Sequence, residues 1–270
     1  MAPRLIALLT DYGYSDPFAG ILRAVIASED PAIPVIDLSH GVTRHDVVAG
    51  AVALADSAPY LPRDSVVVAV VDPGVGGDRR AVAVEAADGR LFVGPDNGLL
   101  SLALDACGGA ARAVDIGESD WRLPDLAHTF DGRDIFAPVA ARLAIGAPLA
   151  DAGSAIEPVT LQTLALAASS SEDGILTTSV LAIDGFGNAR LAADPTELTG
   201  VTVGDAVEIE IGDGWRAAVF ARTFGDALGQ DPLLIADSSG SLALVVNQGS
   251  AAEQLNLEPG TKLRIQKADR

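Results

Sequence analysis

The chain has 270 residues, 49% of them hydrophobic, and its 18 Lys and Arg stand against 37 Asp and Glu, for a formal net charge of −19. This length and apolar content exclude a disordered chain and allow one large domain or two smaller ones, each with a substantial core. The negative charge disfavours nucleic acid as a partner, and the apolar run Leu5–Leu9 is too short for a signal sequence or a membrane span. We therefore expect a cytoplasmic protein with no membrane partner.

Short apolar runs alternate with segments of helical periodicity through the first half of the chain. The runs predict strands at 5–9, 33–38, 66–71, 81–86, 91–94 and 111–116, and the other segments predict helices at 17–27, 47–55, 99–106 and 135–143. Apolar strands separated by helices are typical of a mostly parallel sheet covered on both faces. We therefore predict an N-terminal α/β domain over residues 1–160.

The pattern changes at about residue 174 to short strands separated by Gly and Asp turns, with no convincing helices between them. This pattern predicts an all-β domain, barrel-like or a sandwich, over residues 174–270. Residues 161–173 are the expected linker. Cys107 is the only cysteine in the sequence, which predicts neither a disulfide framework nor a cysteine metal cluster.

Acidic residues follow several predicted strands of the α/β domain. Ligands of open α/β sheets bind beyond the carboxyl ends of the strands, and Asp11, Asp37–His40, Asp72 and Asp96–Gly98 all have this position. For Asp11 two roles are open. It could cap a helix or a turn, or it could accept hydrogen bonds from the two hydroxyls of a ribose.

Asp72 and Arg79 belong to the segment VVDPGVGGDRR, residues 70–80. This segment has neither the Gly-Lys-Ser/Thr of a phosphate loop nor GxGxxG spacing, so a nucleotide phosphate is not its obvious ligand. Arg79 suits fixed, bidentate pairing with a carboxylate. The two residues either form a structural ion pair that closes the loop or take part in chemistry.

A second group lies in HTFDGRDIFAPVAA, residues 128–141. Asp131 precedes Gly132, and a glycine permits a ligand to approach the backbone closely. Asp134 is placed to cap the helix that is expected to begin near Ile135.

A third group lies in AIDGFGNARL, residues 182–191. Asp184, Phe186 and Asn188 combine an acid, an aromatic ring and an amide, which suits a heterocycle with a cationic attachment. The sequence predicts no metal site, because zinc-ligand spacing is lacking among its histidines, His40, His45 and His128.

Six motifs occur in a fixed order from Leu5 to about Leu257: LTDYGYSDPFAGILRAVI, VVDPGVGGDRR, GPDNGLL, TFDGRDIFAPVAA, IDGFGN and SSGSLALVVNQGSAAEQL. Together they resemble the S-adenosyl-L-methionine hydrolases, or hydroxide adenosyltransferases, relatives of the enzymes that make fluoro- and chloro-adenosine. The resemblance implies an α/β domain followed by a β-barrel. It also implies a homotrimer that holds S-adenosyl-L-methionine, as substrate and without a cofactor, between one subunit's N-terminal domain and its neighbour's C-terminal domain.

The resemblance also implies substrate contacts for individual residues. It assigns the ribose hydroxyls to Asp11, the ribose face to Phe130, the methionyl amine to Asp184, the adenine pocket to Phe186 and Asn188, and the methionyl carboxylate to Ser238. Asn247 is expected in the strand whose backbone meets adenine.

The family handles water with an Asp, an Arg and a His, and Asp72 and Arg79 match the first two. The third position departs from the family, because TFHGRD is replaced by TFDGRD, so that Asp131 stands where the histidine is expected and His128 is out of register. Two carboxylates beside one arginine would interact, which predicts a slower hydrolase or an altered pH profile.

The halide-using relatives differ from this chain at the same site. Those that use fluoride carry Tyr at the position of Asp72, Thr at that of Val75 and Ser at that of Gly132, and the chloride branch also carries Tyr at the first of these. Because an acid repels a halide and can orient water, the resemblance favours hydroxide transfer.

The expected reaction is attack of water or hydroxide on the ribose C5′ carbon, with methionine as the leaving group. Positioning by the anchoring residues supplies much of the rate, and the leaving group is already cationic. Two alternatives stay open: a protein that binds S-adenosyl-L-methionine or adenosine without turnover, and a chloride-using adenosyl transferase.

Overall fold

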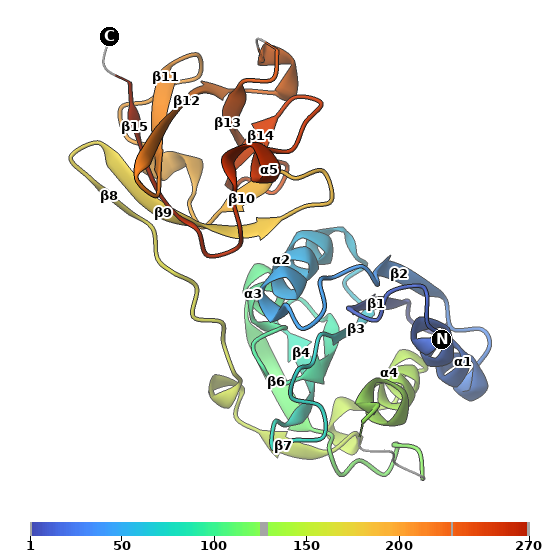
Figure 1. Ribbon diagram of the computed structural model, residues 1–270. Coiled ribbons are helices and arrows are strands. Elements are labelled where there is room, and N and C mark those ends of the chain that lie inside the picture. The colour runs from blue at the N-terminus through green and yellow to red at the C-terminus, as the bar shows by residue number, and fades with distance from the viewer. Residues whose placement is uncertain (1, 125–128, 228, 269–270) are drawn as a thin grey trace. The chain divides into compact units, whose positions relative to one another are not determined.

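The computed structural model describes residues 2–124, 129–227 and 229–268, and the chain divides into two compact units, Met1–Leu164 and Ala165–Arg270 (Figure 1). Each unit has a hydrophobic core of its own. Among the helices of the described ranges, none is long and apolar enough to cross a membrane.

A seven-stranded sheet forms the centre of the N-terminal unit, in the order β2-β1-β3-β5-β4-β6-β7. Four neighbours are parallel: β2 (Val35–Ser39), β1 (Ile6–Thr10), β3 (Val66–Val70) and β5 (Leu91–Pro95). The others pair antiparallel: β4 (Ala81–Ala86), β6 (Ala110–Asp115) and β7 (Ser154–Ile156). Because β1 and β3 are parallel neighbours with Thr10 opposite Val70, the loops that follow them begin side by side.

Helices cover both faces of this sheet (Figure 1). The helices α1 (Phe18–Glu29) and α4 (Ala137–Ala144) pack on one face, and α2 (Val47–Ser57) and α3 (Ser101–Ala106) pack on the other. Strand β1 serves both cores, since Ile6 and Leu8 face α1 and α4 whereas Ala7 and Leu9 face α2 and α3. Side chains alternate along a strand, so a strand covered on both faces needs an unbroken apolar run.

The last helical segment of this unit begins earlier than expected. A π-helical turn, Gly132–Phe136, runs directly into α4, and the side chain of Asp134 pairs with Arg133 inside it. Pro138 accounts for the irregular turn, because it has no N–H to offer the Asp134 carbonyl. That carbonyl accepts a hydrogen bond of 2.8 Å from the Leu123 N–H instead. The prediction that Asp134 caps a new helix was therefore wrong.

The C-terminal unit is a closed β-barrel. Seven strands pair in the order β10-β14-β13-β12-β11-β15-β9, β9 pairs with β10 to close the ring, and β8 adds to β9. In chain order they are β8 (Ser170–Glu172), β9 (Ile175–Ile183), β10 (Ala189–Leu191), β11 (Ala206–Ile211), β12 (Gly214–Ala221), β13 (Pro232–Ala236), β14 (Leu242–Val246) and β15 (Lys262–Lys267). The predicted fold class, a mostly parallel α/β domain followed by an all-β barrel-like domain, is confirmed.

A short helix interrupts the strands of the barrel unit, where none was expected. It is α5 (Ala251–Leu255), and the Ser250 hydroxyl caps it by accepting a hydrogen bond of 3.1 Å from the Glu253 N–H. Five residues are too few to display a helical period. Asn247 lies in the turn between β14 and this helix, so the expectation that it sits within the strand was wrong.

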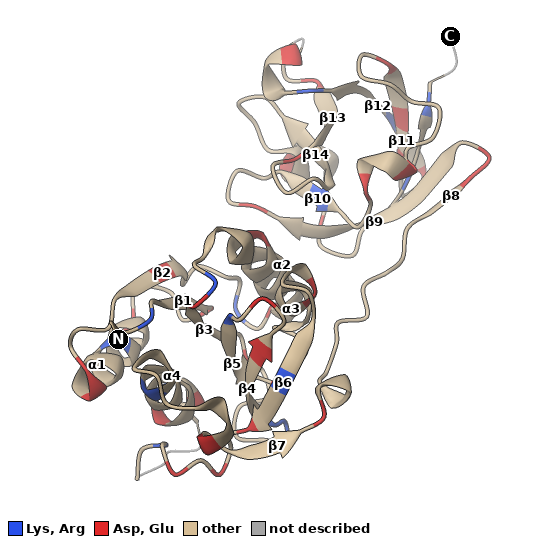
Figure 2. Ribbon diagram, turned by 180° about the vertical axis from the view of Figure 1, so that it is seen from behind, with Lys and Arg blue, Asp and Glu red and all other residues tan. Residues whose placement is uncertain are grey.

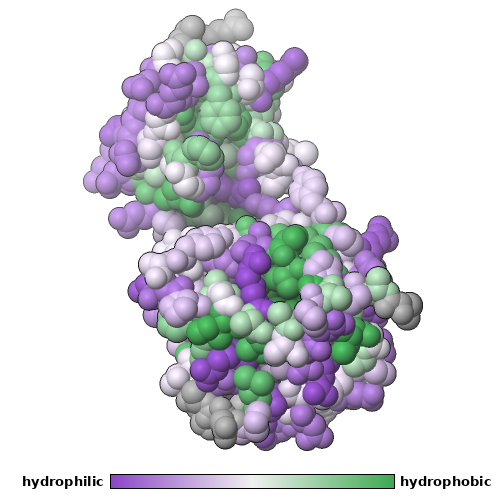
Figure 3. Space-filling view, turned by 90° about the vertical axis from the view of Figure 1, so that its right-hand side faces the viewer, coloured by the Kyte–Doolittle hydropathy of each residue, from purple (hydrophilic) through white to green (hydrophobic). Residues whose placement is uncertain are grey.

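Charge and apolar surface are distributed over both units. Acidic side chains outnumber basic ones (Figure 2), in line with the net charge of −19. Apolar side chains also reach the surface in patches (Figure 3), and among the most exposed large ones is Phe186, with 82% of its surface open to solvent. An exposed phenylalanine in one of the predicted site motifs is available to a ligand or to another protein surface.

Candidate active site

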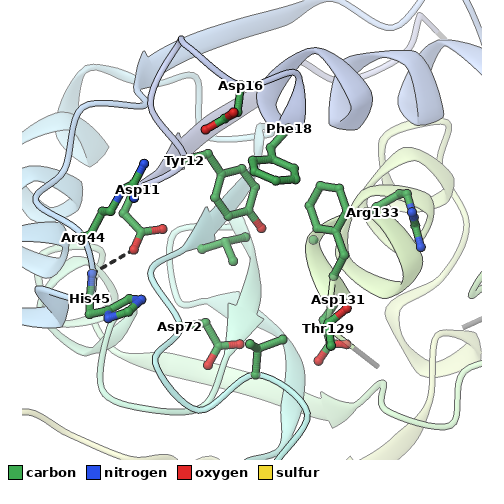
Figure 4. A pocket seen from close by; sticks show the side chains of 14 residues that line it. Asp11, Tyr12, Asp16, Phe18, Arg44, His45, Asp72, Thr129, Asp131 and Arg133 are labelled. Atoms are coloured by element: carbon green, nitrogen blue, oxygen red, sulfur yellow. Dashed lines mark hydrogen bonds between the residues drawn. The ribbon is translucent and has the colours of Figure 1, made fainter. Parts of the chain in front are cut away.

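A cavity of about 590 Å³ opens in the N-terminal unit beyond the carboxyl ends of β1 and β3 (Figure 4). Four predicted site residues line it together: Asp11, Asp72, Phe130 and Asp131. Its wall also contains Asp16, Arg44 and Arg133, so four carboxylates face two guanidinium groups. A wall with an excess of negative charge suits a cationic ligand.

One arginine joins Asp72, which follows β3, to Asp131, which precedes the π-helical turn. Arg79 donates from Nε to Asp72 Oδ2 at 2.9 Å and from Nη2 to the same oxygen at 2.5 Å, and Nη2 also donates to Asp131. Their side chains are 4% exposed for Asp72, 13% for Arg79 and 10% for Asp131. Burial by itself would lower the pKa of Arg79, but the hydrogen bonds to Asp72 and Asp131 raise it, so the guanidinium stays charged.

Arg79 holds the two carboxylates by hydrogen bonds, but it is not one of the residues that line the cavity. Its guanidinium lies 5.7 Å from the centre of the Phe136 ring. The pair closes the loop, and Asp72 also lines the cavity, so a part in chemistry stays a prediction. Asp131, which is 52 positions further along the chain than Arg79, joins the pair only through the tertiary fold.

Asp11 connects two loops at the cavity wall. Its Oδ2 accepts a hydrogen bond of 2.9 Å from the N–H of His45, a residue with a φ of 65°. A non-glycine residue in this left-handed region is uncommon and is found where the surrounding structure enforces it. Asp11 does not cap α1, whose N-terminal residue Pro17 has no side-chain cap, and its second oxygen accepts no hydrogen bond from the described residues. That oxygen is available to a ligand.

Asp37 lies within β2 and not beyond its end, where it was expected, and His40 directly follows the strand; together they support the loop at the cavity. The Thr10 hydroxyl and Nδ1 of the fully buried His40 share a hydrogen bond of 2.8 Å, and Nε2 of His40 lies 3.1 Å from Asp37. Burial would raise the pKa of Asp37, but hydrogen bonds from Arg23 and His40 hold it below its ordinary value. The Thr10 hydroxyl also accepts a hydrogen bond of 3.1 Å from the Tyr12 N–H, which fixes the start of the loop at the cavity.

Tyr12 and Asp16 line the cavity, although sequence reasoning did not select them. Both lie in the motif that contains Asp11, and an aromatic residue directly after a site acid is the signal that could have identified Tyr12. Its ring makes edge contacts with Phe18 and Phe130, with centres 5.9 and 5.6 Å apart. A Cβ at Gly132 would lie 2.3 Å from the Tyr12 hydroxyl oxygen, so this hydroxyl requires a glycine opposite.

The acid after β5 has a structural role. Asp96 Oδ2 accepts hydrogen bonds from Arg80 at 2.8 and 2.5 Å, and Oδ1 accepts one of 2.7 Å from the Gln162 N–H. Its side chain is 4% exposed. Asp96 thus holds Gln162, in the segment after β7, at the end of β5, and it does not line the cavity.

Three predicted site residues of the barrel unit, Asp184, Phe186 and Asn188, lie in one compact turn between β9 and β10. Asp184 Oδ1 accepts from the N–H groups of Phe186 and Asn188 at 2.8 and 2.9 Å, and Oδ2 accepts from the Asn188 amide at 2.8 Å. The Asp184 carboxylate therefore shapes the turn that displays Phe186. Gly187 packs against Ser250, where an added Cβ would lie 2.1 Å from the Ser250 hydroxyl oxygen.

Ser238 and Asn247 lie at opposite ends of β14. Asn247 follows the strand and is close in sequence to Ser250, which packs on the Asp184 turn. Ser238 is exposed in the turn between β13 and β14, where the neighbouring Asp237 bonds to Arg190. Because Ala189 pairs with Leu244, the end of β14 that Asn247 follows is the end beside the Asp184 turn, whereas Ser238 precedes the other end of the strand.

In residues 2–124, 129–227 and 229–268, no group of three or more His, Cys, Asp and Glu side chains is arranged to hold a metal ion. His40 is part of the buried support, and His45 lines the cavity. His128 lies outside the described residues.

Comparison with known proteins identifies relatives along almost the whole chain. The SAM hydroxide adenosyltransferase N-terminal domain matches residues 6–153, and the C-terminal domain of the same family matches residues 178–264. The chain is 47% identical to an (R)-S-adenosyl-L-methionine hydrolase of Salinispora tropica, over 98% of this chain and 99% of that protein.

A second relative and a solved structure extend this similarity. An (R)-S-adenosyl-L-methionine hydrolase of Thermus thermophilus is 40% identical, over 97% of this chain and 99% of the relative. The crystal structure of an uncharacterized conserved protein from Thermotoga maritima superposes with a TM-score of 0.91 at 30% identity, covering 97% of this chain and all of the other.

Proposed function

The chain belongs to the SAM hydroxide adenosyltransferase family, and we propose that it hydrolyses S-adenosyl-L-methionine to adenosine and L-methionine. The observation that carries the proposal is the pair of carboxylates, Asp72 and Asp131, that a single partly buried arginine holds at the wall of the cavity. An acidic wall attracts the cationic sulfonium substrate, and a carboxylate there can accept a proton from water.

The reaction is an in-line displacement at the ribose C5′ carbon. The water oxygen forms a bond to C5′, the C5′–sulfur bond breaks, and its electron pair leaves with the sulfur of methionine. The water loses one proton, which Asp72 accepts and passes to solvent. The sulfonium charge is neutralised as the transition state forms, so a cavity that is poor in water lowers the barrier. Asp11, with one oxygen held by His45 and the other available, binds the ribose hydroxyls.

Arg79 has an indirect part in this scheme. Both of its bonding nitrogens are engaged by Asp72 and Asp131, and it does not line the cavity. We therefore assign it the positioning of the two carboxylates, in place of the direct handling of water that the resemblance implied.

Two other functions compete with hydrolysis. Asp131 at the family's histidine position is the feature that favours binding of S-adenosyl-L-methionine or adenosine without turnover. A chloride-using transferase requires a halide beside Asp72 and Asp131, and two carboxylates repel it.

The proposal extends to a homotrimer that completes the site. Asp184, Phe186, Asn188, Ser238 and Asn247 would then contact the substrate of a neighbouring subunit. Two observations support this part: Phe186 is 82% exposed, and the Asp184 turn is rigidly hydrogen-bonded. The proposal also includes a cytoplasmic location.

The test is incubation of the purified protein with S-adenosyl-L-methionine in ¹⁸O-labelled water, with and without chloride, followed by chromatography and mass spectrometry of the nucleosides. Adenosine that carries ¹⁸O, with an equal amount of methionine and no effect of chloride, is expected. Retained ligand without product would favour the binding protein, and chloro-adenosine would favour the transferase.

A further inference from the structure

The phenol of Tyr12 is fixed in the wall of the cavity. Its ring lies between edge contacts to Phe18 and Phe130, and its N–H is held by the Thr10 hydroxyl at 3.1 Å. The hydroxyl points into the cavity, toward the side where Asp72 and Asp131 lie (Figure 4). Among the residues that the structure describes, none accepts or donates a hydrogen bond at this oxygen. The hydroxyl is therefore free to bond to a ligand.

Gly132 and Tyr12 are direct neighbours in the wall of the cavity, and a side chain at residue 132 would overlap the Tyr12 hydroxyl. A Cβ at residue 132 would stand 2.3 Å from the Tyr12 oxygen and 3.3 Å from its Cζ. The hydroxyl thus fills the space that a side chain at residue 132 would occupy, directly beside Asp131.

A water molecule at Asp72 and Asp131 needs a donor that neither residue provides. Carboxylates accept the hydrogens of water but leave its oxygen without a partner to fix its lone pairs. Arg79 uses Nε and Nη2 for the two carboxylates and does not line the cavity, and Arg133 uses Nε and Nη2 for Asp134 at 2.5 and 3.0 Å. Burial raises the pKa of Tyr12 well above its ordinary value, and the charges of nearby aspartates raise it further. The phenol therefore keeps its proton and acts as a donor at any working pH.

We propose that Tyr12 is a catalytic residue whose hydroxyl donates a hydrogen bond to the oxygen of the attacking water. This inference rests on the proposed hydrolysis. The bond occupies one lone pair of the water and leaves the other directed at C5′, while Asp72 accepts the proton that is lost. The water keeps its oxygen and one hydrogen, which become the 5′-hydroxyl of adenosine, and methionine departs with the electron pair of the broken C5′–sulfur bond. Tyr12 ends the step with its own proton.

The first test is Tyr12→Phe, which removes the hydroxyl and keeps the ring between Phe18 and Phe130. We expect kcat to fall by about 10- to 100-fold, at or below the lower end of the range of about 100- to 1000-fold for removal of a positioned donor, with KM and the Kd for adenosine changed by less than about twofold. Tyr60→Phe is the matched control, because Tyr60 is 83% exposed and lies outside the cavity. This control should keep wild-type kcat and KM.

A second test moves the hydroxyl from residue 12 to residue 132. In Tyr12→Phe the atoms nearest to a Cβ at residue 132 are the ring carbon at 3.3 Å and a Phe130 carbon at 3.4 Å, so a small side chain fits with a slight adjustment. We expect Tyr12→Phe/Gly132→Ser to recover part of the lost kcat, and Tyr12→Phe/Gly132→Ala to recover none.

Three outcomes separate the inference from its premise. A wild-type protein that forms no adenosine refutes the proposed function itself. An active wild type with unchanged kcat in Tyr12→Phe overturns only the role of Tyr12. Equal activities of the Ser and Ala double variants would also overturn it, because the loss would then come from packing and not from the missing donor.

Discussion

Removal of the Arg79 guanidinium tests how the two site carboxylates are held. Arg79→Met keeps an unbranched side chain of similar length but leaves Asp72 and Asp131 without their shared cation. These carboxylate side chains are only 4% and 10% exposed, so water replaces little of the lost interaction. Removing one partner from a buried ion pair costs about 3 to 5 kcal/mol, because a charge is left uncompensated.

We expect Arg79→Met to lower the free energy of unfolding by about 3 to 5 kcal/mol, because the Arg79 side chain is only 13% exposed and pairs with two carboxylates. For a unit of this size each kcal/mol shifts the Tm by about 2 to 4 °C, so we expect the Tm of the N-terminal unit to fall by roughly 6 to 20 °C. The helical signal in far-UV circular dichroism reports mainly on this unit, because α1, α2, α3 and α4 all belong to it and the described part of the barrel unit contributes only one short α-helix, α5.

Two variants control the experiment. Arg112→Met removes an arginine of the same unit that pairs with Glu85 at the surface, where its side chain is 64% exposed, and should change stability by no more than about 1 kcal/mol. Arg79→Met combined with Asp72→Asn and Asp131→Asn removes the uncompensated charges and should recover much of the Tm. A loss below about 1 kcal/mol in Arg79→Met would refute the view that buried charge pairing holds this cluster.

Further predictions concern the reaction and the barrel unit. Asp72→Asn should leave the Kd for S-adenosyl-L-methionine nearly unchanged while kcat falls by about 100-fold or more, the usual effect of losing a general base; full turnover would remove Asp72 from the mechanism. Asp131→His should keep or raise kcat in the same chromatographic assay, and a complete loss would show that Asp131 has a role of its own. Hydrogen bonds from Lys267 and Thr202 hold the pKa of Asp205 at about 2. The pKa in the folded state is thus below the ordinary carboxylate value, so this stabilisation is present above about pH 4 and is lost as the pH falls toward 2. Lys267→Met should therefore move the acid unfolding of the barrel unit, measured by near-UV circular dichroism at low salt, to slightly higher pH. Acid-unfolding curves that coincide for the variant and the wild type would contradict this.

Local pattern was enough to predict the two fold classes and part of the site. An unbroken apolar strand such as Ile6–Thr10 can only be stable when both faces are covered, which is why a run of that kind already indicates an α/β sheet. Asp72 and Arg79 are seven positions apart across one loop, so their pairing is decided within a short stretch of chain. The turn from Asp184 to Asn188 is likewise closed by its own acid.

The tertiary structure decided which of these residues meet and what they do. Asp131 reaches Arg79 because a distant helical segment packs beside β3, and no spacing in the sequence contains that contact. Arg79 does not line the cavity, and its Nε and Nη2 bond to the two carboxylates. The Tyr12 hydroxyl has room at the cavity only because residue 132, 120 positions further along the chain, is a glycine. Periodicity records which side chains are buried, whereas a site depends on distances between segments far apart in the chain, and only the folded chain sets those distances.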